Sequence, residues 1–384
     1  MLKLFPIVKF SMTLLYSFFK LFPTQKKVVF LSRQYNSPPI DFLMLEREIK
    51  HRNDSVKTVM IVERIEFSVA ANSGLKVNKF DAGRRLLKNM LRSMYHVATS
   101  KVAILDTYSP VISLLNHKRS LKVIQIWHAM GKIKQSGYKN LDTEGGGRSS
   151  KVAKVMKMHE GYDLIVAGGK AWNRFYQESF NCSEDVLYNV GLPRIDYMIE
   201  NWDEIRDKIY ASHPLLQEKP TILYAPTWRK TDISGWDDFI KKFNFEKFNL
   251  VLKSHPNQEL PTPDGMVERL PEFSTLECLA ITDFLITDYS ATAVEAAALN
   301  VKTFYYLYDF EIYSTKNGLN IDLFSEMPDC VFEKADVLLD ALNDERYNDF
   351  AFNQYKAKFL PETIGHSTKL ITDKIFEFLE GVVE

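Results

Sequence analysis

The chain has 384 residues, of which 46% are hydrophobic and 26% are charged, as in a folded protein of about two or three domains. Lys plus Arg and Asp plus Glu both number 49, and this balance disfavours a general nucleic-acid binder, which would carry a basic excess. The three cysteines, Cys182, Cys278 and Cys330, are far apart and form no CxxC pair. They disfavour a disulfide framework or a zinc site and fit a reducing compartment.

An uncharged run of ten residues, Phe10–Phe19, lies between two lysines near the start of the chain. It is shorter than the roughly 20 apolar residues that a membrane-spanning helix needs, and no small-residue cleavage site of a signal peptide follows it. On a helical wheel a narrow polar stripe is formed by Lys9, Thr13, Ser17 and Lys20. We therefore expect residues 1–24 to form a helix in a membrane interface; the alternative is a helix docked on the protein's own core.

Short β-branched runs alternate with longer amphipathic runs along the rest of the chain, which is typical of parallel βαβ units. The first series has strand candidates at Lys26–Ser32, Val56–Glu63, Val102–Asp106, Lys122–Trp127 and Asp163–Gly168, with a helix at Asp41–Arg52. The second series has strand candidates at Thr221–Pro226, Phe248–His255, Phe284–Asp288 and Lys302–Leu307. This α/β pattern predicts two Rossmann-like domains whose parallel sheets face a cleft, with ligands beyond the carboxyl ends of the strands.

The boundary between the two series is expected within 195–220, where Asp203–Tyr210 has a helical pattern. This division gives an N-terminal domain over 25–200 and a C-terminal domain over 201–384. A last helical stretch begins near Phe350, and the sequence leaves open whether it crosses back onto the first domain.

Two further stretches, Arg84–Tyr95 and Lys151–Met158, have the pattern of basic amphipathic helices. Such a helix binds anionic lipid or is simply a solvated helix on a core. Together with the N-terminal helix, the two stretches indicate a membrane surface as one partner.

His128 follows the strand candidate that ends at Trp127. The turn beyond it is short and basic and contains Gly131, Lys132 and Lys134. An imidazole at the carboxyl end of a strand can take a proton from an attacking hydroxyl, since its ordinary pKa is about 6.5. The alternative is a structural histidine with satisfied hydrogen bonds.

Polar residues also follow three strand candidates of the second series. They are Lys253 and His255; Thr227, Arg229 and Lys230; and Asp288, Ser290, Thr292 and Glu295. Arginine offers a planar fork to phosphate, and the N–H groups of a helix N-terminus with nearby hydroxyls form an anion site. Arg194 and Asp196 fall near the domain boundary, where cleft residues are expected. Taken singly, each set is also compatible with surface charges, a helix cap or a plain ion pair.

Taken together, these side chains suit a dianionic phosphate group better than a metal, a hydride or an acyl group. The sequence has no GxGxxG, Walker, GxSxG or HExxH motif and no clustered carboxylates for magnesium. We therefore expect neither a metal nor another cofactor.

Five segments, taken in order, resemble motifs of the CDP-glycerol glycerophosphotransferase family of teichoic acid synthesis, which includes ribitol-phosphate transferases. They are WHA (Trp127–Ala129), GLPRID (Gly191–Asp196), YAPTWR (Tyr224–Arg229), SHP (Ser254–Pro256) and TDYSA (Thr287–Ala291). YAPTWR and TDYS are the specific ones, whereas WH and HP are weak by themselves.

The resemblance implies a GT-B-like fold with an N-terminal acceptor domain and a C-terminal CDP-donor domain. It implies attachment to the cytoplasmic face of the membrane as a peripheral protein, with a CDP-polyol, a lipid-linked polymer and an anionic membrane surface as partners. A polyol phosphate would pass from the CDP-polyol to a teichoic acid or capsule acceptor, and CMP would leave.

By position, the resemblance assigns the general base to His128, the donor phosphates to His255, Arg229, Ser290 and Thr292, and the nucleotide ribose to Glu295. Three positions depart from the family pattern: Ala129 stands for a Gly, Ala291 for a Ser, and Asn317 for an Arg. They leave the polyol and the acceptor open. Two other functions remain alternatives: a sugar-nucleotide glycosyltransferase or epimerase on the same fold, and a non-catalytic membrane-bound protein that binds the acceptor.

Overall fold

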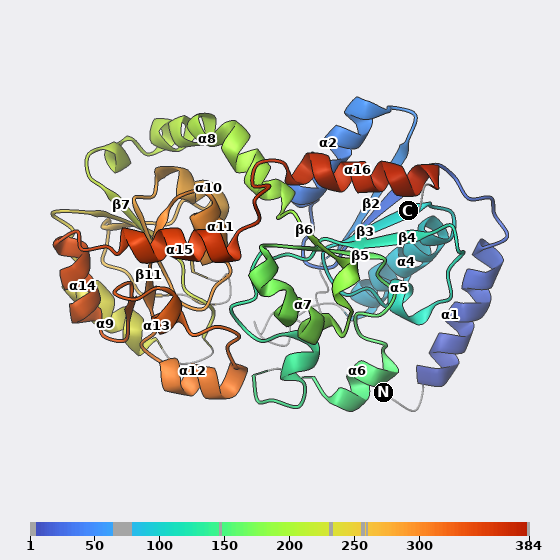
Figure 1. Cartoon of the computed structure of the whole chain (residues 1–384), viewed down its shortest axis with the longest axis horizontal. Coiled ribbons are helices and arrows are strands. Elements are labelled where there is room, and N and C mark those ends of the chain that lie inside the picture. The colour runs from blue at the N-terminus through green and yellow to red at the C-terminus, as the bar shows by residue number, and fades with distance from the viewer. Residues whose placement is uncertain are drawn as a thin grey trace.

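The chain forms two parallel β-sheets that lie side by side (Figure 1). The computed structural model describes residues 5–63, 79–145, 148–229, 233–254, 258 and 260–381. Within them each sheet has six strands, and the paired strands run parallel. The predicted α/β class with two Rossmann-like sheets is confirmed.

The first sheet has the strand order β2-β1-β3-β4-β5-β6. Its strands are β1 (Lys27–Ser32), β2 (Lys57–Val62), β3 (Val102–Leu105), β4 (Lys122–Gln125), β5 (Leu164–Ala167) and β6 (Leu187–Asn189). Along β1, Val28 and Phe30 enter one core while Val29 and Leu31 enter another on the opposite face. Because both faces are covered, a central strand of this sheet is a continuous apolar run.

Helices cover both faces of the first sheet. One face packs against α2 (Ile40–Arg52) and the C-terminal α16 (Ser367–Glu380). The other packs against α1 (Phe5–Phe19), α4 (Lys79–Ala98) and α5 (Pro110–Leu114). The short helices α6 (Ser150–Val155) and α7 (Asn173–Phe180) complete this half.

The second sheet has the order β12-β11-β10-β7-β8-β9. Its strands are β7 (Thr221–Tyr224), β8 (Asn249–Leu252), β9 (Val267–Glu268), β10 (Phe284–Thr287), β11 (Lys302–Tyr306) and β12 (Val331–Phe332). Counted from β7 and read from β9, the strands follow the order 3-2-1-4-5-6 of a dinucleotide-binding fold. The helices of this half are α8 (Pro193–Ser212), α9 (Ser234–Lys242), α10 (Thr275–Cys278), α11 (Thr292–Ala298), α12 (Phe310–Asn317), α13 (Leu323–Glu326), α14 (Ala335–Asn343) and α15 (Asp349–Phe359).

The last helix, α16, returns to the first sheet and lies beside α2 (Figure 1). Arg52 of α2 forms an ion pair of 2.5 Å with Asp373 and donates to the carbonyl of Lys369 at 3.2 Å. At its N-terminus, α16 is held by Asp196, whose carboxylate accepts from the N–H groups of Ser367 and Thr368 at 3.3 and 2.6 Å. Asp196, expected in the cleft, therefore serves as a buried cap that ties α8 to α16.

Each predicted strand is present, shortened by one to three residues at one or both ends. The strands β6, β9 and β12 were not predicted. Each has only two or three residues, which is too short for a periodic pattern to appear in the sequence.

The N-terminal helix α1 presents two different faces. Met12 and Tyr16 are buried against the first sheet, and the Tyr16 hydroxyl lies 2.6 Å from Nδ1 of His117. The outward face is apolar and largely exposed, with Ile7, Phe10, Leu14 and Phe18 at 63%, 70%, 66% and 55% exposure, and Leu21 just beyond the helix is 80% exposed. Docking on the core and an apolar surface thus coexist in one helix. Among the described helices, none has the length and apolarity to cross a membrane.

Candidate functional site

Each sheet has a point at which its strand order reverses, and ligands of doubly wound folds bind there, beyond the carboxyl ends of the strands. In the first sheet this point lies between β1 and β3, where Ser32 Oγ donates to Asp106 Oδ2 at 2.6 Å. In the second it lies between β7 and β10, where Thr227 Oγ1 donates to Asp288 Oδ1 at 2.6 Å. A hydroxyl and a carboxylate therefore mark both switch points.

His128 lies beside the first switch point, three residues beyond Gln125, the last residue of β4. The residue before it, Trp127, has φ 58, a left-handed conformation that is rare for a bulky side chain and is characteristic of functional turns. The Trp127 N–H donates to Gln125 Oε1 at 2.9 Å, and the indole packs on the imidazole with ring centroids 4.0 Å apart. The turn is thus rigidly held.

The hydrogen bonding of His128 favours one tautomer. Its Nδ1 lies 3.2 Å from the carbonyl oxygen of Asp106, which can only accept, so the proton belongs on Nδ1 and Nε2 keeps its lone pair. The Gln34 side-chain amide lies 3.3 Å from the same Nδ1. With its nitrogen and oxygen exchanged by an amide flip, it presents an acceptor oxygen to the Nδ1 proton. Burial above all lowers the pKa of His128 to about 4; the hydrogen bond to the Asp106 carbonyl raises it and Lys132 lowers it by smaller amounts, so the ring is neutral at pH 7.

Arg194 connects this turn to both halves of the chain. It stands at the start of α8, where Pro193 begins the helix, and its side chain forms a buried ion pair with Asp41 of α2 through Nε at 2.9 Å and through Nη2. Its Nη1 donates to Glu295 of α11 at 3.2 Å and lies 3.5 Å from the carbonyl of His128. Glu295, expected to bind the ribose, is thus already paired with Arg194, and burial raises its pKa.

Lys132 occupies an aromatic cage behind His128. It is 3% exposed, and its Nζ lies 4.5, 4.9 and 4.3 Å from the ring centroids of Trp127, Tyr176 and Phe180. Nζ also donates to Ser136 Oγ at 3.1 Å. Burial lowers the pKa of Lys132 to about 7. Lys132 is therefore only partly charged at pH 7, and the rings stabilise its charged form next to the His128 turn.

Arg229 is held by two carboxylates at the second switch point. Its Nε lies 2.7 Å from Asp309 and its Nη1 lies 2.9 Å from Asp288. Nη1 also donates to the carbonyl of Thr227 at 2.7 Å. In this arrangement the guanidinium positions the turn after β7 against the turn after β10; its contact with a donor phosphate stays a prediction.

The remaining predicted residues of the second half fall into two groups. Ser290 and Thr292 lie just beyond Asp288, with Ser290 Oγ donating to Thr292 Oγ1 at 3.0 Å, and they remain candidates for a phosphate. Lys253 instead directs its ammonium to the carbonyls of Leu270, at 2.6 Å, and Phe273. His255 and Lys230 lie outside the described residues.

The loop after His128 is packed against the second half. Asn320 donates from Nδ2 to the carbonyl of Lys132 at 2.7 Å and from its backbone to Ile133 at 2.9 Å. Lys134 Nζ reaches Thr227 Oγ1 at 3.4 Å. A Cβ on Gly131 would lie 2.5 Å from Val294 Cγ2, so only glycine permits this approach. The carboxyl ends of the two sheets are therefore in contact at this loop.

Several residues of the site were missed in the sequence. Asp106 ends the strand candidate Val102–Asp106. It could have been found by the rule that selected His128, namely that a polar residue at the carboxyl end of a strand is a site candidate. Asp41, Asp309 and Asn320 carry no local signal, because their partners lie far away along the chain.

Two doubly wound parallel sheets whose carboxyl ends meet around a histidine and a buried arginine define a GT-B-like α/β protein. Residues 14–377 match the family described as CDP-glycerol:poly(glycerophosphate) glycerophosphotransferase. The chain belongs to this family.

Curated relatives carry related descriptions. The teichoic acid poly(ribitol-phosphate) polymerase of Bacillus spizizenii is 24% identical over 378 residues, which are 94% of this chain and 58% of the relative. The teichoic acid glycerol-phosphate primase of Bacillus subtilis is 28% identical over 62% of this chain and 64% of its own length. The teichoic acid ribitol-phosphate primase of Bacillus spizizenii is 25% identical over 83% of this chain and 87% of its own length. The chain thus spans less than two thirds of the first two relatives.

Solved structures share the fold. The wall teichoic acid polymerase TagF superposes with a TM-score of 0.74 at 17% identity and covers 98% of this chain and 95% of its own. The UDP-GlcNAc 2-epimerase from Neisseria meningitidis has a TM-score of 0.57 at 12% identity over 91% of this chain and 99% of its own. Because the architecture is shared with an epimerase, the fold by itself does not decide the reaction.

The contact between Gly131 and Val294 can be tested by substitution. Gly131→Ala should lower the free energy of unfolding by about 1–3 kcal/mol, because the added methyl overlaps Val294. The double variant with Val294→Ala should be more stable than the sum of the single effects predicts, as measured by chemical denaturation. Gly83→Ala is the matched control, since a Cβ there meets nothing within 4 Å. A Gly131→Ala variant as stable as the wild type would contradict this packing.

Proposed function

We propose that the chain is a transferase that moves a polyol phosphate, glycerol phosphate or ribitol phosphate, from a CDP-polyol to a lipid-linked teichoic acid or capsule polymer. The observation that carries the proposal is the neutral His128 at the carboxyl end of β4, in a chain that matches the glycerophosphotransferase family over residues 14–377. The relatives are named as glycerol- and ribitol-phosphate primases and polymerases, which supports the substrate class.

In the proposed reaction the acceptor hydroxyl lies at His128 Nε2. As its oxygen bonds to the β-phosphorus of the donor, Nε2 takes the hydroxyl proton. The bond between that phosphorus and the bridging oxygen breaks, and CMP leaves with the electron pair. An imidazole with a low pKa is a weak base, but a bound dianionic donor raises the pKa of His128 and thereby strengthens it. Cationic groups nearby, among them Lys132 in its charged form, stabilise the charge that develops on the phosphoryl oxygens.

We assign the donor to the second half, residues 201–384, and the acceptor to the first, residues 25–200. The Rossmann strand order of the second sheet supports a nucleotide beyond β7 and β10, near Thr227, Ser290 and Thr292. His255 follows the neighbouring β8 and is proposed to contact the donor phosphates. The proximity of His128 to the first switch point supports an acceptor hydroxyl on the side of the first half.

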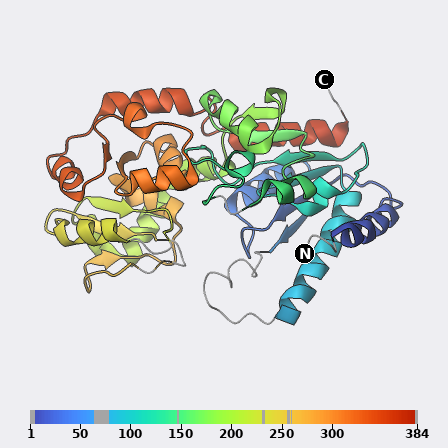
Figure 2. The ribbon, with the colours of Figure 1, turned by 90° about the horizontal axis from the view of Figure 1, so that it is seen from below.

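The protein is further proposed to attach to the cytoplasmic face of the membrane as a peripheral protein. The exposed apolar face of α1 and the basic side of α4 support this attachment, and the two helices lie side by side at the end of the molecule away from the second sheet (Figure 2). Arg84, Lys88 and Arg92 of α4 are exposed. An apolar face flanked by cations is the arrangement by which interfacial helices bind anionic lipid.

The reaction is tested by incubating the purified protein with CDP-glycerol or CDP-ribitol and a lipid-linked acceptor analogue, while CMP release is measured. CMP should appear with one of the two donors and only when acceptor is present. Turnover of UDP- or CMP-sugars without CMP release from either CDP-polyol would instead establish a sugar-nucleotide enzyme. Absence of any turnover would favour a non-catalytic acceptor-binding protein.

The role of His128 is tested with His128→Ala in the same assay. Loss of the base should lower turnover at least ~100-fold while the circular dichroism spectrum and melting temperature stay close to those of the wild type. His51→Ala is the matched control, because His51 is 82% exposed on the opposite face of α2 from the core. Near-normal turnover of His128→Ala would remove His128 as the base.

Membrane attachment is tested by co-sedimentation with vesicles that contain phosphatidylglycerol. The double variant Phe10→Asp, Leu14→Asp should reduce the bound fraction at least ~10-fold, because charged groups resist burial among the lipid chains. Phe350→Asp is the matched control, since Phe350 is 75% exposed on α15 in the second half. Equal binding by the wild type and the double variant would exclude α1 as the anchor.

A further inference from the structure

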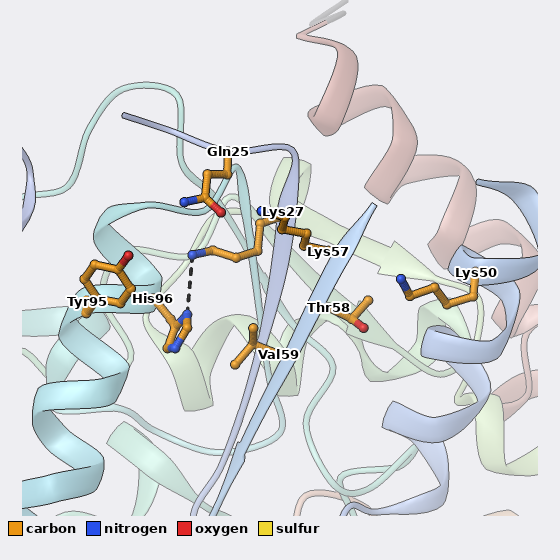
Figure 3. A pocket seen from close by; sticks show the side chains of 8 residues that line it. All are labelled: Gln25, Lys27, Lys50, Lys57, Thr58, Val59, Tyr95 and His96. Carbon is orange, nitrogen blue, oxygen red and sulfur yellow. Dashed lines mark hydrogen bonds between the residues drawn. The ribbon is translucent and has the colours of Figure 1, made fainter. Parts of the chain in front are cut away.

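A hollow of about 330 Å³ lies at the amino edge of the first sheet (Figure 3). Its walls come from the starts of β1 and β2 and from the C-terminal ends of α2 and α4. His128 and Asp106 belong to the opposite edge, about 20 Å away along a six-residue strand. The hollow is therefore separate from the candidate site described above.

The walls of this hollow are strongly basic. Lys27, Lys50 and Lys57 line it from three different elements, and none of its lining residues is acidic. Beside the hollow, Glu46 accepts from Thr58, and Asp54 forms an ion pair of 3.7 Å with Lys50. Lys27 and Lys57 have no ion pair among the described residues, and their ammonium groups create a local positive potential in a chain of zero net charge.

Lys27 is the unusual member of the set because it is only 3% exposed. Figure 3 shows its amino group pointing toward Tyr95 and His96 at the end of α4. Nζ donates to Thr99 Oγ1 at 2.6 Å and lies 3.4 Å from His96 Nδ1 and 5.5 Å from the centroid of the Tyr95 ring. Within the part of the chain that the structure describes, Lys27 has no ion pair, and a buried charge without a counterion is unfavourable.

Burial and neighbouring cations lower the pKa values of Lys27 and His96. Burial, and then the charge of Lys57, lower the pKa of Lys27 to about 8, so its ammonium is still mostly charged at pH 7. Burial, and then Lys27 and Arg92, lower the pKa of His96 to about 4. An anion between these groups would offset the charge repulsion, which is the smaller contribution to both shifts after burial.

We propose that this hollow is a second anion site, which takes the phosphate group of a lipid headgroup or of a soluble phosphate ester. Its donors are the ammonium groups of Lys27 and Lys57, with the Gln25 amide beside them. Charge-assisted bonds from lysine suit phosphate oxygens. The small volume admits a headgroup or a single phosphate ester, and the proposal is independent of the transfer reaction.

The position of the hollow favours the lipid as the source. Tyr95 packs edge-on against Phe19, the last residue of α1, and against Phe22, with ring centroids 5.7 and 5.8 Å apart. Phe22 and Leu21 are 40% and 80% exposed. The basic hollow thus adjoins the apolar end of α1, as headgroup and acyl chain adjoin in a lipid.

The test measures binding of dihexanoyl phosphatidylglycerol and of inorganic pyrophosphate to the full chain by calorimetry. The double variant Lys27→Met, Lys57→Gln should weaken binding of the phosphate-bearing probe at least ~10-fold. Lys170→Gln, which removes an exposed lysine elsewhere in the first half, should bind as the wild type does. Met at position 27 removes a buried charge, so folding of the variant is not at risk.

If the double variant weakens binding of the lipid analogue alone, the hollow is a headgroup site. If it weakens binding of pyrophosphate alone, the hollow is a site for soluble phosphate esters. Equal affinities of the double variant and the wild type for both probes, or no binding of either, overturn the proposal. His128→Ala should keep this binding, and the double variant should keep CMP release with a soluble acceptor analogue. Failure of the transferase hypothesis is therefore distinguishable from failure of this one.

Discussion

Arg194 is a buried guanidinium whose partners come from three parts of the chain. Asp41 belongs to the helix after β1, Glu295 to the helix after β10, and the carbonyl of His128 to the turn after β4. A buried charge that lost these partners would be strongly unfavourable, so the contact holds the carboxyl ends of the two sheets in one relative position. The placement of the His128 turn against the second half depends on this arrangement.

Around Arg194, hydrogen bonds and burial set the protonation and position of polar side chains before a substrate binds. The carbonyl of Asp106 sets the tautomer of His128, and the aromatic cage keeps a lysine charge out of water next to it. Charges in such a water-poor environment act more strongly on a substrate than they would at the surface. Arg229 is likewise paired with two carboxylates, those of Asp288 and Asp309. A cation that holds two turns together needs fixed counterions more than it needs freedom to move.

The first sheet carries different chemistry at its two edges. Its carboxyl edge holds His128 and Asp106 and contacts the second half, whereas its amino edge holds Lys27 and Lys57 and adjoins α1. Parallel strands separate these edges by their full length, so the proposed anion site and the candidate histidine occupy one domain without competing for space.

The sequence by itself determined the α/β class, nearly all of the longer strands and the family, because these depend on local periodicity and on short contiguous motifs. It also selected His128, since a residue just beyond a strand must lie at the sheet edge. The tertiary structure decided which predicted residues share a site. Asp196 caps a helix more than 170 residues away, Lys253 binds main-chain carbonyls, and Arg229 pairs with Asp309, 80 residues further along the chain. Such pairings arise when separate elements pack, and no pattern of neighbouring residues encodes them.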